Sequence, residues 1–374
     1  MRIAQVANFH GPRSGGLRTA LRALGRGYVD SGDDVLLVVP GDRDHAEDTP
    51  QGHVVTLHSP VLPGSGGYRV ITRLAAVKDI LARFAPDALE IHDRTTLIPL
   101  ADWARRRRVV TAFVAHERAD GVLAGLAPRA GVAAARRLAA AHSRDVARRF
   151  DLVVATTSFA GEELARTGAR VDTVPLGVDL LTFDPRRHSP LARRALARPE
   201  DTLVVLASRL SSEKRPEIAV EAVRDLAARG RPVRLVVAGA GPLDRRLRRQ
   251  ARDLPVEFLG FVDDRRTYAA LLASADVLVA PGPIETFGLA ALEGLASGTP
   301  AVVNRASALP EVVGAAGIGA EGTPRAFADG VEAILARDGR ARRIAARSRA
   351  EELPWHATVA RMRALHVGAL AGRR

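Results

Sequence analysis

Cysteine is absent from this 374-residue sequence, and lysine occurs only twice, as Lys78 and Lys214. Without cysteine the chain has neither disulfides nor thiolate chemistry. Aromatic residues make up only 4% of the chain, which argues against a basic groove lined with aromatic rings, so we expect no nucleic-acid partner. Apolar runs reach only about five to seven residues, whereas a helix that spans a bilayer needs about 20.

Positive charge is abundant, and arginine supplies nearly all of a formal net charge of +13. Such a charge fits an anionic membrane surface or, more ordinarily, solvated arginines on the outer faces of helices. The arginines that could rest on anionic lipid are Arg105 to Arg108, Arg136, Arg137, Arg148 and Arg149. The N-terminus has the pattern of a first strand and not of a signal peptide. We therefore expect a cytoplasmic protein, peripheral on the inner face of the cell membrane if these arginines bind lipid.

Strand and helix patterns alternate along the whole chain. An apolar strand over residues 2–8, a Gly-rich turn and an amphipathic helix are typical of the start of a doubly wound α/β domain. The alternation ends near residue 185 and restarts near residue 200, across a segment rich in Pro, Arg and Ala that suggests a linker. We expect two α/β domains, 1–185 and 200–353, each with a parallel sheet covered by helices. An amphipathic segment, 354–374, follows them.

The stretch from Pro281 to Glu293 has the clearest chemical pattern. A buried strand over 276–280 runs into it and is broken by Pro281, Gly282 and Pro283. From Phe287 onward the apolar spacing is helical, with Thr286 as the expected N-cap and Gly288 in the first turn. The N-terminus of a helix offers backbone N–H groups and a positive dipole end, which suit a phosphate.

Two carboxylates flank this helix start, Glu285 and Glu293. Eight residues of helix separate them by about 12 Å along the axis. This distance is too long for a shared proton or a shared metal ion. It suits a ligand held at two ends on either side of a phosphate.

Polar residues also follow other predicted strands. Gly15 and Gly16 follow the first strand and fit either a phosphate cradle or an ordinary tight turn. The segment lacks a full G-x-G-x-x-G and an acidic residue after the second strand, so a dinucleotide site is not expected. His116 ends the apolar strand 109–115 and is either structural or a contact to a ligand near the reacting bond.

The second half carries a pair of cations after its first strand, Arg209 and Lys214. Arginine offers a planar fork and lysine a point charge, and together they suit a diphosphate. Solvated surface residues are the alternative, although lysine is so scarce that Lys214 stands out. Val262 lies in a loop after a later strand and could meet a nucleobase edge through its main chain. The Gly-rich turn at 238–242 is assigned no contact.

Taken in order, these pieces resemble the retaining GT-B glycosyltransferases of family 4. The matching motifs are the Gly-Gly loop, the His after a mid-domain strand, Pro-Leu-Gly-Val-Asp, Ser-Arg-Leu-x-x-x-Lys, Ala-Gly-x-Gly-Pro, Leu-Gly-Phe-Val and Glu-x7-Glu. They cover almost the whole chain. The resemblance implies two Rossmann-like domains that face each other across a cleft, with the final segment crossing back onto the first domain. It also implies a nucleotide-sugar donor on the second domain, an acceptor on the first, and no obligatory metal.

The resemblance further implies roles for the candidate residues. Arg209 and Lys214 neutralise the leaving diphosphate, Glu285 holds sugar hydroxyls, and Glu293 holds the ribose. His116 contacts the transferred sugar, and the leaving phosphate takes the acceptor proton, so that the anomeric configuration is retained. The full set of expected donor contacts is Gly15, Gly16, Arg209, Lys214, Val262, Glu285, Thr286, Phe287, Gly288, Leu289 and Glu293.

More narrowly, the segments around residues 7–20, 63–69, 93–97 and 280–289 look like actinobacterial GDP-mannose-dependent α-mannosyltransferases, some of which mannosylate glycolipids. Thr286 stands where a Gly or Pro is frequent in the family, close to the sugar, so donor identity stays open. One alternative is a UDP-sugar transferase with a small soluble acceptor, such as an antibiotic or an inositol derivative. Another is an Arg-rich binding protein that has kept the fold without catalysis.

Overall fold

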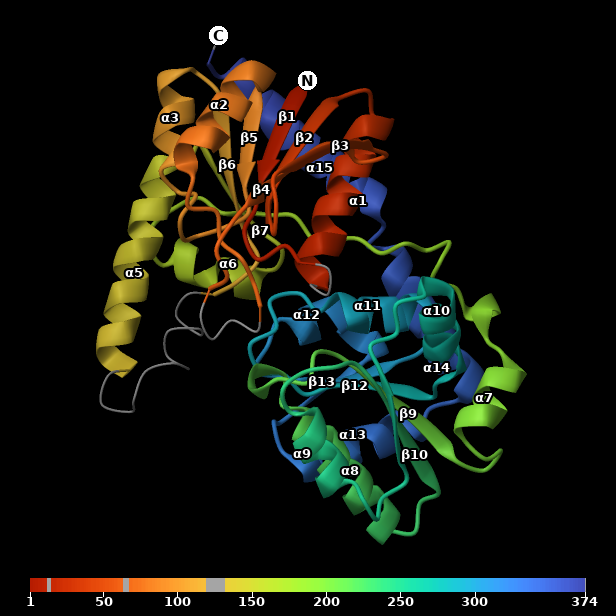
Figure 1. The fold of residues 1–374 in the computed structure, drawn as a ribbon. Helices are drawn as coiled ribbons and strands as arrows, with labels where there is room; N and C mark the ends of the chain where they lie inside the picture. The colour runs from red at the N-terminus through yellow and green to blue at the C-terminus, as the bar shows by residue number, and fades with distance from the viewer. Residues whose placement is uncertain (12–14, 63–66, 119–131, 374) are drawn as a thin grey trace. The chain divides into compact units, whose positions relative to one another are not determined.

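The computed structural model describes residues 1–11, 15–62, 67–118 and 132–373 (Figure 1). The chain forms two compact units: Met1–Leu176 together with Trp355–Arg374, and Gly177–Pro354. Within the described residues, no helix is both long and apolar enough to cross a membrane. Each unit has its own sheet and its own core.

The first unit contains an eight-stranded sheet in the order β3-β4-β2-β1-β5-β6-β7-β8. All neighbours are parallel except β3, which pairs antiparallel with β4. The strands are β1 (Arg2–Val6), β2 (Asp34–Gly41), β3 (His45–Thr49), β4 (Gly52–His58), β5 (Ala88–Ile91), β6 (Val110–Ala115), β7 (Leu152–Ala155) and β8 (Asp172–Thr173). Strand β3 was not expected from the sequence, because its His-Ala-Glu-Asp-Thr segment is polar and mostly exposed at the sheet edge.

Helices cover both faces of this sheet. The helices are α1 (Gly16–Asp30), α2 (Leu74–Phe84), α3 (Leu100–Arg106), α5 (Val132–Arg149), α6 (Ser158–Ala165) and α15 (Trp355–Ala371). Side chains of α2, α3, α5 and α6 share one core with Ala4 and Val6 of β1. Side chains of α1 and α15 share another core with Ile3. Since successive residues of a strand point to opposite faces, the two cores lie on opposite sides of the sheet.

The last helix, α15, is part of the first unit and packs beside α1 (Figure 1). Its apolar side includes Val359 and Met362, which are buried as the amphipathic pattern predicted. Arg363 donates from Nε to the buried carboxylate of Asp33 at 2.6 Å. Thr358 donates from Oγ1 to the carbonyl oxygen of Pro175 at 2.8 Å. Apolar burial and polar contacts together fix this helix to its unit.

The second unit contains a parallel six-stranded sheet in the order β11-β10-β9-β12-β13-β14. The strands are β9 (Thr202–Ala207), β10 (Val233–Ala238), β11 (Val256–Gly260), β12 (Val277–Ala280), β13 (Ala301–Asn304) and β14 (Ile318–Ala320). The helices are α7 (Pro190–Leu196), α8 (Pro216–Ala228), α9 (Asp244–Gln250), α10 (Arg265–Ser274), α11 (Leu289–Ala296), α12 (Leu309–Val313), α13 (Pro324–Leu335) and α14 (Gly339–Glu351). The strand order reverses between β9 and β12, and ligands of doubly wound sheets bind at such a switch point, beyond the carboxyl ends of the strands.

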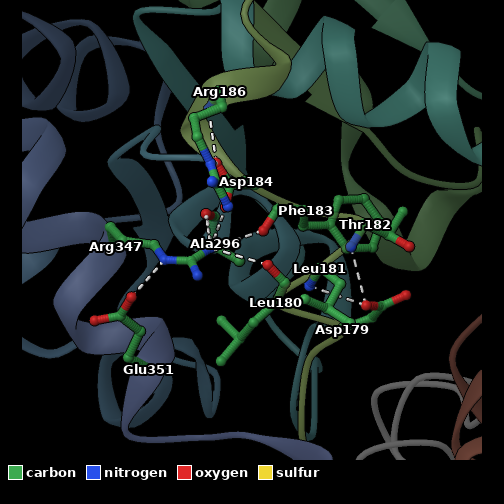
Figure 2. Close-up of polar contacts among 10 residues, drawn as sticks. All are labelled: Asp179, Leu180, Leu181, Thr182, Phe183, Asp184, Arg186, Ala296, Arg347 and Glu351. Carbon is green, nitrogen blue, oxygen red and sulfur yellow. Dashed lines mark hydrogen bonds and ion pairs between the residues drawn. The ribbon is translucent and has the colours of Figure 1, made fainter.

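The segment expected to be a linker, 185–200, instead belongs to the second unit. The residues just before it are held in that unit by Arg347 (Figure 2). Arg347 of α14 donates from Nη1 to the carbonyl oxygens of Phe183, at 2.8 Å, and Ala296, at 2.9 Å. Its Nε donates to Glu351 at 2.7 Å. Further along, Arg193 of α7 donates to the carboxylate of Asp276 at 2.9 Å. The composition of the segment suggested a linker. Composition cannot show that arginines contact backbone oxygens and carboxylates elsewhere in the unit.

Candidate active site

Lys214 and Glu285 meet at the switch point of the second unit. Lys214 ends a short 3₁₀ helix, Ser212–Lys214, that follows β9, and Glu285 lies in the loop that follows β12. Lys214 Nζ donates to Glu285 Oε1 at 2.6 Å, and the two side chains are 28% and 20% exposed. The sequence predicted both residues for the site, and the structure adds that they contact each other. The contact follows from the strand order, because β9 and β12 are neighbours whose carboxyl ends lie at one edge of the sheet.

The loop that carries Glu285 is held by β13 and the turn after it. Asn304, at the end of β13, is 2% exposed and donates from Nδ2 to the carbonyl oxygen of Pro281 at 2.8 Å. The backbone N–H of Ala308 donates to the carbonyl oxygen of Glu285 at 2.9 Å. Sequence reasoning missed Asn304. A polar residue at the end of an apolar strand was the available signal, the same one that identified His116.

The helix after this loop begins later than expected. Helix α11 starts at Leu289, and its N-cap is Gly288, with a φ of 80° and no side-chain cap. Thr286 is therefore not the N-cap, and Phe287 and Gly288 are not in the first turn. A Cβ on Gly288 would lie 2.1 Å from Leu309 Cδ2, so this position requires glycine for its space and for its left-handed backbone.

A hollow connects these parts of the second unit. Its lining residues are Ala207, Ser208, Lys214, Ala280, Pro281, Gly282, Glu285, Gly288, Ala290, Ala291 and Leu309. The start of α11 therefore borders the same space as Lys214 and Glu285. Of the other predicted donor contacts, Phe287 and Leu289 are buried, so they are suited to offer main-chain groups and not side chains.

The Gly-rich turn after β10 packs directly on the loop that carries Arg209. The N–H of Leu210 donates to the carbonyl oxygen of Ala240 at 3.0 Å. A Cβ on Gly239 would lie 1.8 Å from the carbonyl oxygen of Ser208. The glycine thus allows two backbones to approach more closely than any side chain permits. The sequence assigns this turn no ligand contact. In the structure it packs against the loop that carries the partly exposed Arg209.

Glu293 lies on α11 among groups that the sequence did not point to. Its carboxyl is hydrogen-bonded to the Tyr268 hydroxyl, and Arg265 Nη2 lies 3.9 Å from its Oε1. Burial raises the pKa of Glu293 to about 7; Arg265 and Tyr268 oppose the rise, and Asp179 adds to it. Tyr268 and Arg265 lie on α10, directly after the loop with Val262. The glutamate predicted to hold a ribose is thus a group that changes charge near neutral pH.

In the first unit, the predicted residues follow strands at one edge of the sheet. Gly15 is the N-cap of α1, without a side-chain cap, and Gly16 is its first residue. His116 directly follows β6 and is partly buried. Burial lowers the pKa of His116 to about 3; nearby His92 lowers it further, and Glu90 opposes both. His116 is therefore neutral at physiological pH and suited to hydrogen bonding more than to proton donation.

The chain matches two family models, one in each half. Residues 15–177 match the model described as a glycosyl transferase 4-like domain, and residues 190–351 match glycosyl transferases group 1. A GDP-mannose-dependent alpha-(1-6)-phosphatidylinositol dimannoside mannosyltransferase of Mycobacterium tuberculosis (strain ATCC 25177 / H37Ra) is 48% identical over 374 residues, which cover 99% of this chain and 97% of that protein. A GDP-mannose-dependent alpha-mannosyltransferase of Corynebacterium glutamicum (strain ATCC 13032) is 27% identical over 314 residues, covering 82% and 73%.

Solved structures give the same fold. Sucrose-phosphate synthase from Thermosynechococcus elongatus aligns with a TM-score of 0.79 at 21% identity, over 99% of each chain. HepE from Anabaena, in complex with UDP, aligns with a TM-score of 0.75 at 18% identity, over 98% of this chain and all of that one. Both have the GT-B fold that the sequence predicted. The chain is thus an enzyme, a GT-B glycosyltransferase that belongs to the family 4-like, group 1 glycosyltransferases.

Proposed function

We propose that this enzyme transfers mannose from GDP-mannose to a hydroxyl of a glycolipid, with retention of the anomeric configuration. The Lys214–Glu285 pair beside the start of α11 carries the proposal, because it joins a cation for a diphosphate to a carboxylate for sugar hydroxyls at a switch point. The choice of mannose, GDP and a glycolipid rests on the mycobacterial relative, whose name contains all three features.

The two side chains of the pair bind different parts of the donor. A lysine ammonium has three N–H donors, and one of them is used on Glu285 at 2.6 Å. The others are available to phosphate oxygens, and the second oxygen of Glu285 can accept from sugar hydroxyls. Arg209 and the N–H groups at the start of α11 add positive charge for the diphosphate. Glu293 holds the ribose, and the main chain at Val262 meets the base.

The same groups favour the transition state over the bound substrate. As the glycosidic bond breaks, the sugar becomes oxocarbenium-like and the leaving diphosphate gains negative charge. Arg209 and Lys214 stabilise that charge. The leaving phosphate takes the proton of the attacking hydroxyl on the same face of the sugar, which retains the configuration. His116 and the Gly15–Gly16 turn of the first unit complete the proposed set, with His116 as a neutral contact to the transferred sugar.

Contact with lipid is the part of the proposal that rests on surface charge. Arg105 pairs with Asp102, and Arg149 pairs with Asp145 and Asp102, so these two arginines have less charge to offer to lipid. The exposed arginines Arg106 to Arg108, Arg137 and Arg148 keep this role, with the exposed Leu138 as an apolar neighbour. The Arg136 side chain lies outside the described part of the structure.

A donor panel tests the proposal. The full chain is incubated with GDP-mannose, GDP-glucose, UDP-glucose or UDP-galactose, each with mixed phosphatidylinositol mannosides in vesicles, and nucleotide release is followed. We expect GDP release from GDP-mannose that depends on the lipid. Release of UDP without release of GDP would establish the UDP-sugar alternative instead. Release that needs a soluble inositol derivative and not the vesicles would replace the glycolipid acceptor.

A further inference from the structure

The end of β13 and the turn after it hold the loop that carries Glu285 at two points. Asn304, the last residue of β13, donates from Nδ2 to the carbonyl oxygen of Pro281 at 2.8 Å. The N–H of Ala308 donates to the carbonyl oxygen of Glu285 at 2.9 Å. Pro281 begins the loop, so the two bonds bracket the segment that ends at the carboxylate. The function proposed above assigns a role to Glu285 and none to Asn304.

The orientation of the Asn304 amide follows from its two partners. Its Oδ1 accepts from the N–H of Ala306 at 2.9 Å, and its Nδ2 donates to the carbonyl oxygen of Pro281. A reversed amide would place two donors together at Ala306 and two acceptors together at Pro281. The side chain is 2% exposed, so bulk water does not replace either partner. This position therefore uses both the donor and the acceptor of the amide.

The bond to Pro281 continues the sheet by one residue. Strands β12 and β13 are parallel neighbours, and Ala280 lies opposite Val303. The next residues along the two strands are Pro281 and Asn304, where a side-chain amide takes the place of a backbone N–H. Pro281 is buried, and a buried carbonyl oxygen without a donor costs free energy. Removing the amide therefore favours a shifted loop in which this oxygen finds another partner.

The segment from Asn304 to Leu309 is itself firmly connected. The N–H of Arg305 donates to the carbonyl oxygen of Ala320, the last residue of β14, at 2.8 Å. The Ser307 hydroxyl donates to the carbonyl oxygen of Asn304 at 2.7 Å and accepts from the N–H of Leu309 at 3.2 Å. This segment is thus a fixed support for the loop that it contacts.

The same loop also packs closely against the segment that carries Lys214. A Cβ on Gly282 would lie 3.3 Å from the carbonyl oxygen of Glu213 and 3.3 Å from Lys214 Cα. The side chains of Lys214 and Glu285 meet at 2.6 Å. A loop that lies this close to Lys214 does not shift without changing the Lys214–Glu285 contact.

We propose that Asn304, together with the N–H of Ala308, positions the Glu285 loop against Lys214 and so sets where the Glu285 carboxylate meets the hydroxyls of the transferred sugar. Asn304 is buried and acts through the loop, so it is a positioning residue and not a catalytic one. The contacts are a matter of geometry, whereas their effect on transfer rests on the proposed function.

Hydrogen exchange tests the support of the loop without any substrate. The full chain and the variant Asn304→Leu are placed in deuterated water, and peptides that contain residues 281–288 are compared by mass spectrometry. Leucine has nearly the shape of asparagine but neither donates nor accepts, so we expect these peptides to exchange faster in the variant. Unchanged exchange would refute the proposed support of the loop by Asn304.

Thr299→Val is the matched control, because it removes a similar bond near the other end of β13. The fully buried Thr299 hydroxyl donates to the carbonyl oxygen of Leu272 at 2.6 Å. We expect residues 281–288 to exchange as in the wild type and kcat to stay unchanged. Faster exchange or a lower kcat in this variant, equal to that in Asn304→Leu, would show a general loss of order and contradict a specific role for Asn304.

Kinetics of the same variants test the effect on transfer. We expect Asn304→Leu to lower kcat for GDP release from GDP-mannose, with the vesicles described above, by about 10²-fold, since small misplacements of a group at the reacting bond have effects of this size. The Kd for GDP should stay unchanged, because Glu285 is assigned to the sugar and not to the nucleotide. A wild-type kcat, or a loss confined to the Kd for GDP, would contradict the proposal.

A double-mutant cycle shows whether Asn304 acts through Glu285. In Glu285→Gln the carboxylate that Asn304 positions is gone, so adding Asn304→Leu should slow transfer by less than about threefold more. Two independent defects would multiply instead, to a total of about 10⁴-fold. A multiplied loss would therefore refute the positioning role.

Thermal unfolding of each variant shows whether a lower rate reflects loss of the fold. If Asn304→Leu does not fold, Ala308→Pro takes its place: Ala308 has a φ of −69°, which proline adopts, and the variant removes the N–H that donates to Glu285. We expect the same faster exchange and lower kcat from it, and wild-type values would contradict the proposal. Faster exchange in the variants, with no GDP-mannose transfer by the wild type, would overturn the proposed function and leave the support of the loop standing.

Discussion

At the scale of single residues, the Lys214–Glu285 contact sets how the proposed donor site can act. An ammonium and a carboxylate in hydrogen-bond contact orient each other before any ligand arrives. Because both side chains are partly exposed, solvent screens their attraction, and the pair adds little to folding stability. Its value lies in placement: positive charge for the phosphates and an acceptor for hydroxyls are held side by side.

Glu293 leads to a prediction about pH. Burial raises its pKa to about 7, so the free protein holds this carboxyl partly protonated at neutral pH. Hydroxyl donors from a ribose favour the ionised form and lower the pKa. GDP binding should therefore release protons near pH 7 and tighten as pH rises from 6 to 8. Calorimetry in buffers of different ionisation enthalpy measures that release. Glu293→Gln should abolish it; proton uptake, or release that persists in this variant, would remove Glu293 from the ribose site.

Polar residues that follow an apolar strand were the site candidates that the sequence could point to. Lys214, Glu285 and His116 each follow an apolar strand, and this position was visible without a structure. Asn304 shows the same pattern at the end of β13 and was overlooked, whereas His92 and Glu90 were missed for another reason. Their importance comes from partners distant in the sequence, such as His366 for Glu90, and no local pattern shows such a contact.

At the scale of elements, periodicity predicted the buried strands and the amphipathic helices, and it failed where an element is polar or is held by side chains. The polar edge strand β3 has no alternating apolar side chains that face a core. Helix α7 was not predicted, because it lies in a stretch whose composition resembles that of a linker. The start of α11 was placed too early, because the pattern of Leu289, Leu292 and Leu295 does not show that Gly288 adopts a left-handed conformation.

The turn between β10 and α9 gives a prediction about packing. In Gly239→Ala the new Cβ would lie 1.8 Å from the carbonyl oxygen of Ser208, so a backbone must move. We expect a loss of about 2 kcal/mol or more in the free energy of unfolding and weaker GDP binding, since the displaced loop carries Arg209. Denaturant unfolding and calorimetry measure both. Gly339→Ala, where a Cβ meets nothing within 4 Å, should change neither. A Gly239→Ala protein with wild-type stability would contradict the close backbone approach.

At the scale of the whole molecule, the order of the motifs predicted the GT-B fold and the enzyme class better than any single motif did. The sequence also placed the final helix on the first domain through family resemblance, and the structure includes α15 in the first unit. The boundary between the halves was less predictable. The first unit ends at Leu176 rather than near 185, because Arg347 ties the carbonyl oxygens that follow to the second unit.

Surface charge leads to a prediction about lipid. We expect the protein to pellet with vesicles that contain phosphatidylinositol and not with neutral vesicles, and to be released by added salt, since exposed charges are screened within about 10 Å at 0.1 M. The double variant Arg106→Gln/Arg108→Gln should bind more weakly, at about 1 kcal/mol per arginine. Arg245→Gln/Arg246→Gln removes the same charge from the second unit as a control. Absent binding, or binding that salt does not weaken, would exclude an electrostatic contact.

The most direct test of the central claim is the mass of the lipid product. The full chain is incubated with GDP-mannose and phosphatidylinositol dimannoside in vesicles, and the lipids are analysed by mass spectrometry, with Glu285→Gln and Glu213→Gln compared in parallel. We predict that the acceptor gains one hexose, that Glu285→Gln slows this gain by about 10²-fold while GDP still binds, and that Glu213→Gln, a carboxylate variant one residue from Lys214, does not slow it. A lipid of unchanged mass alongside active transfer to another acceptor, or a full rate from Glu285→Gln, would contradict the account.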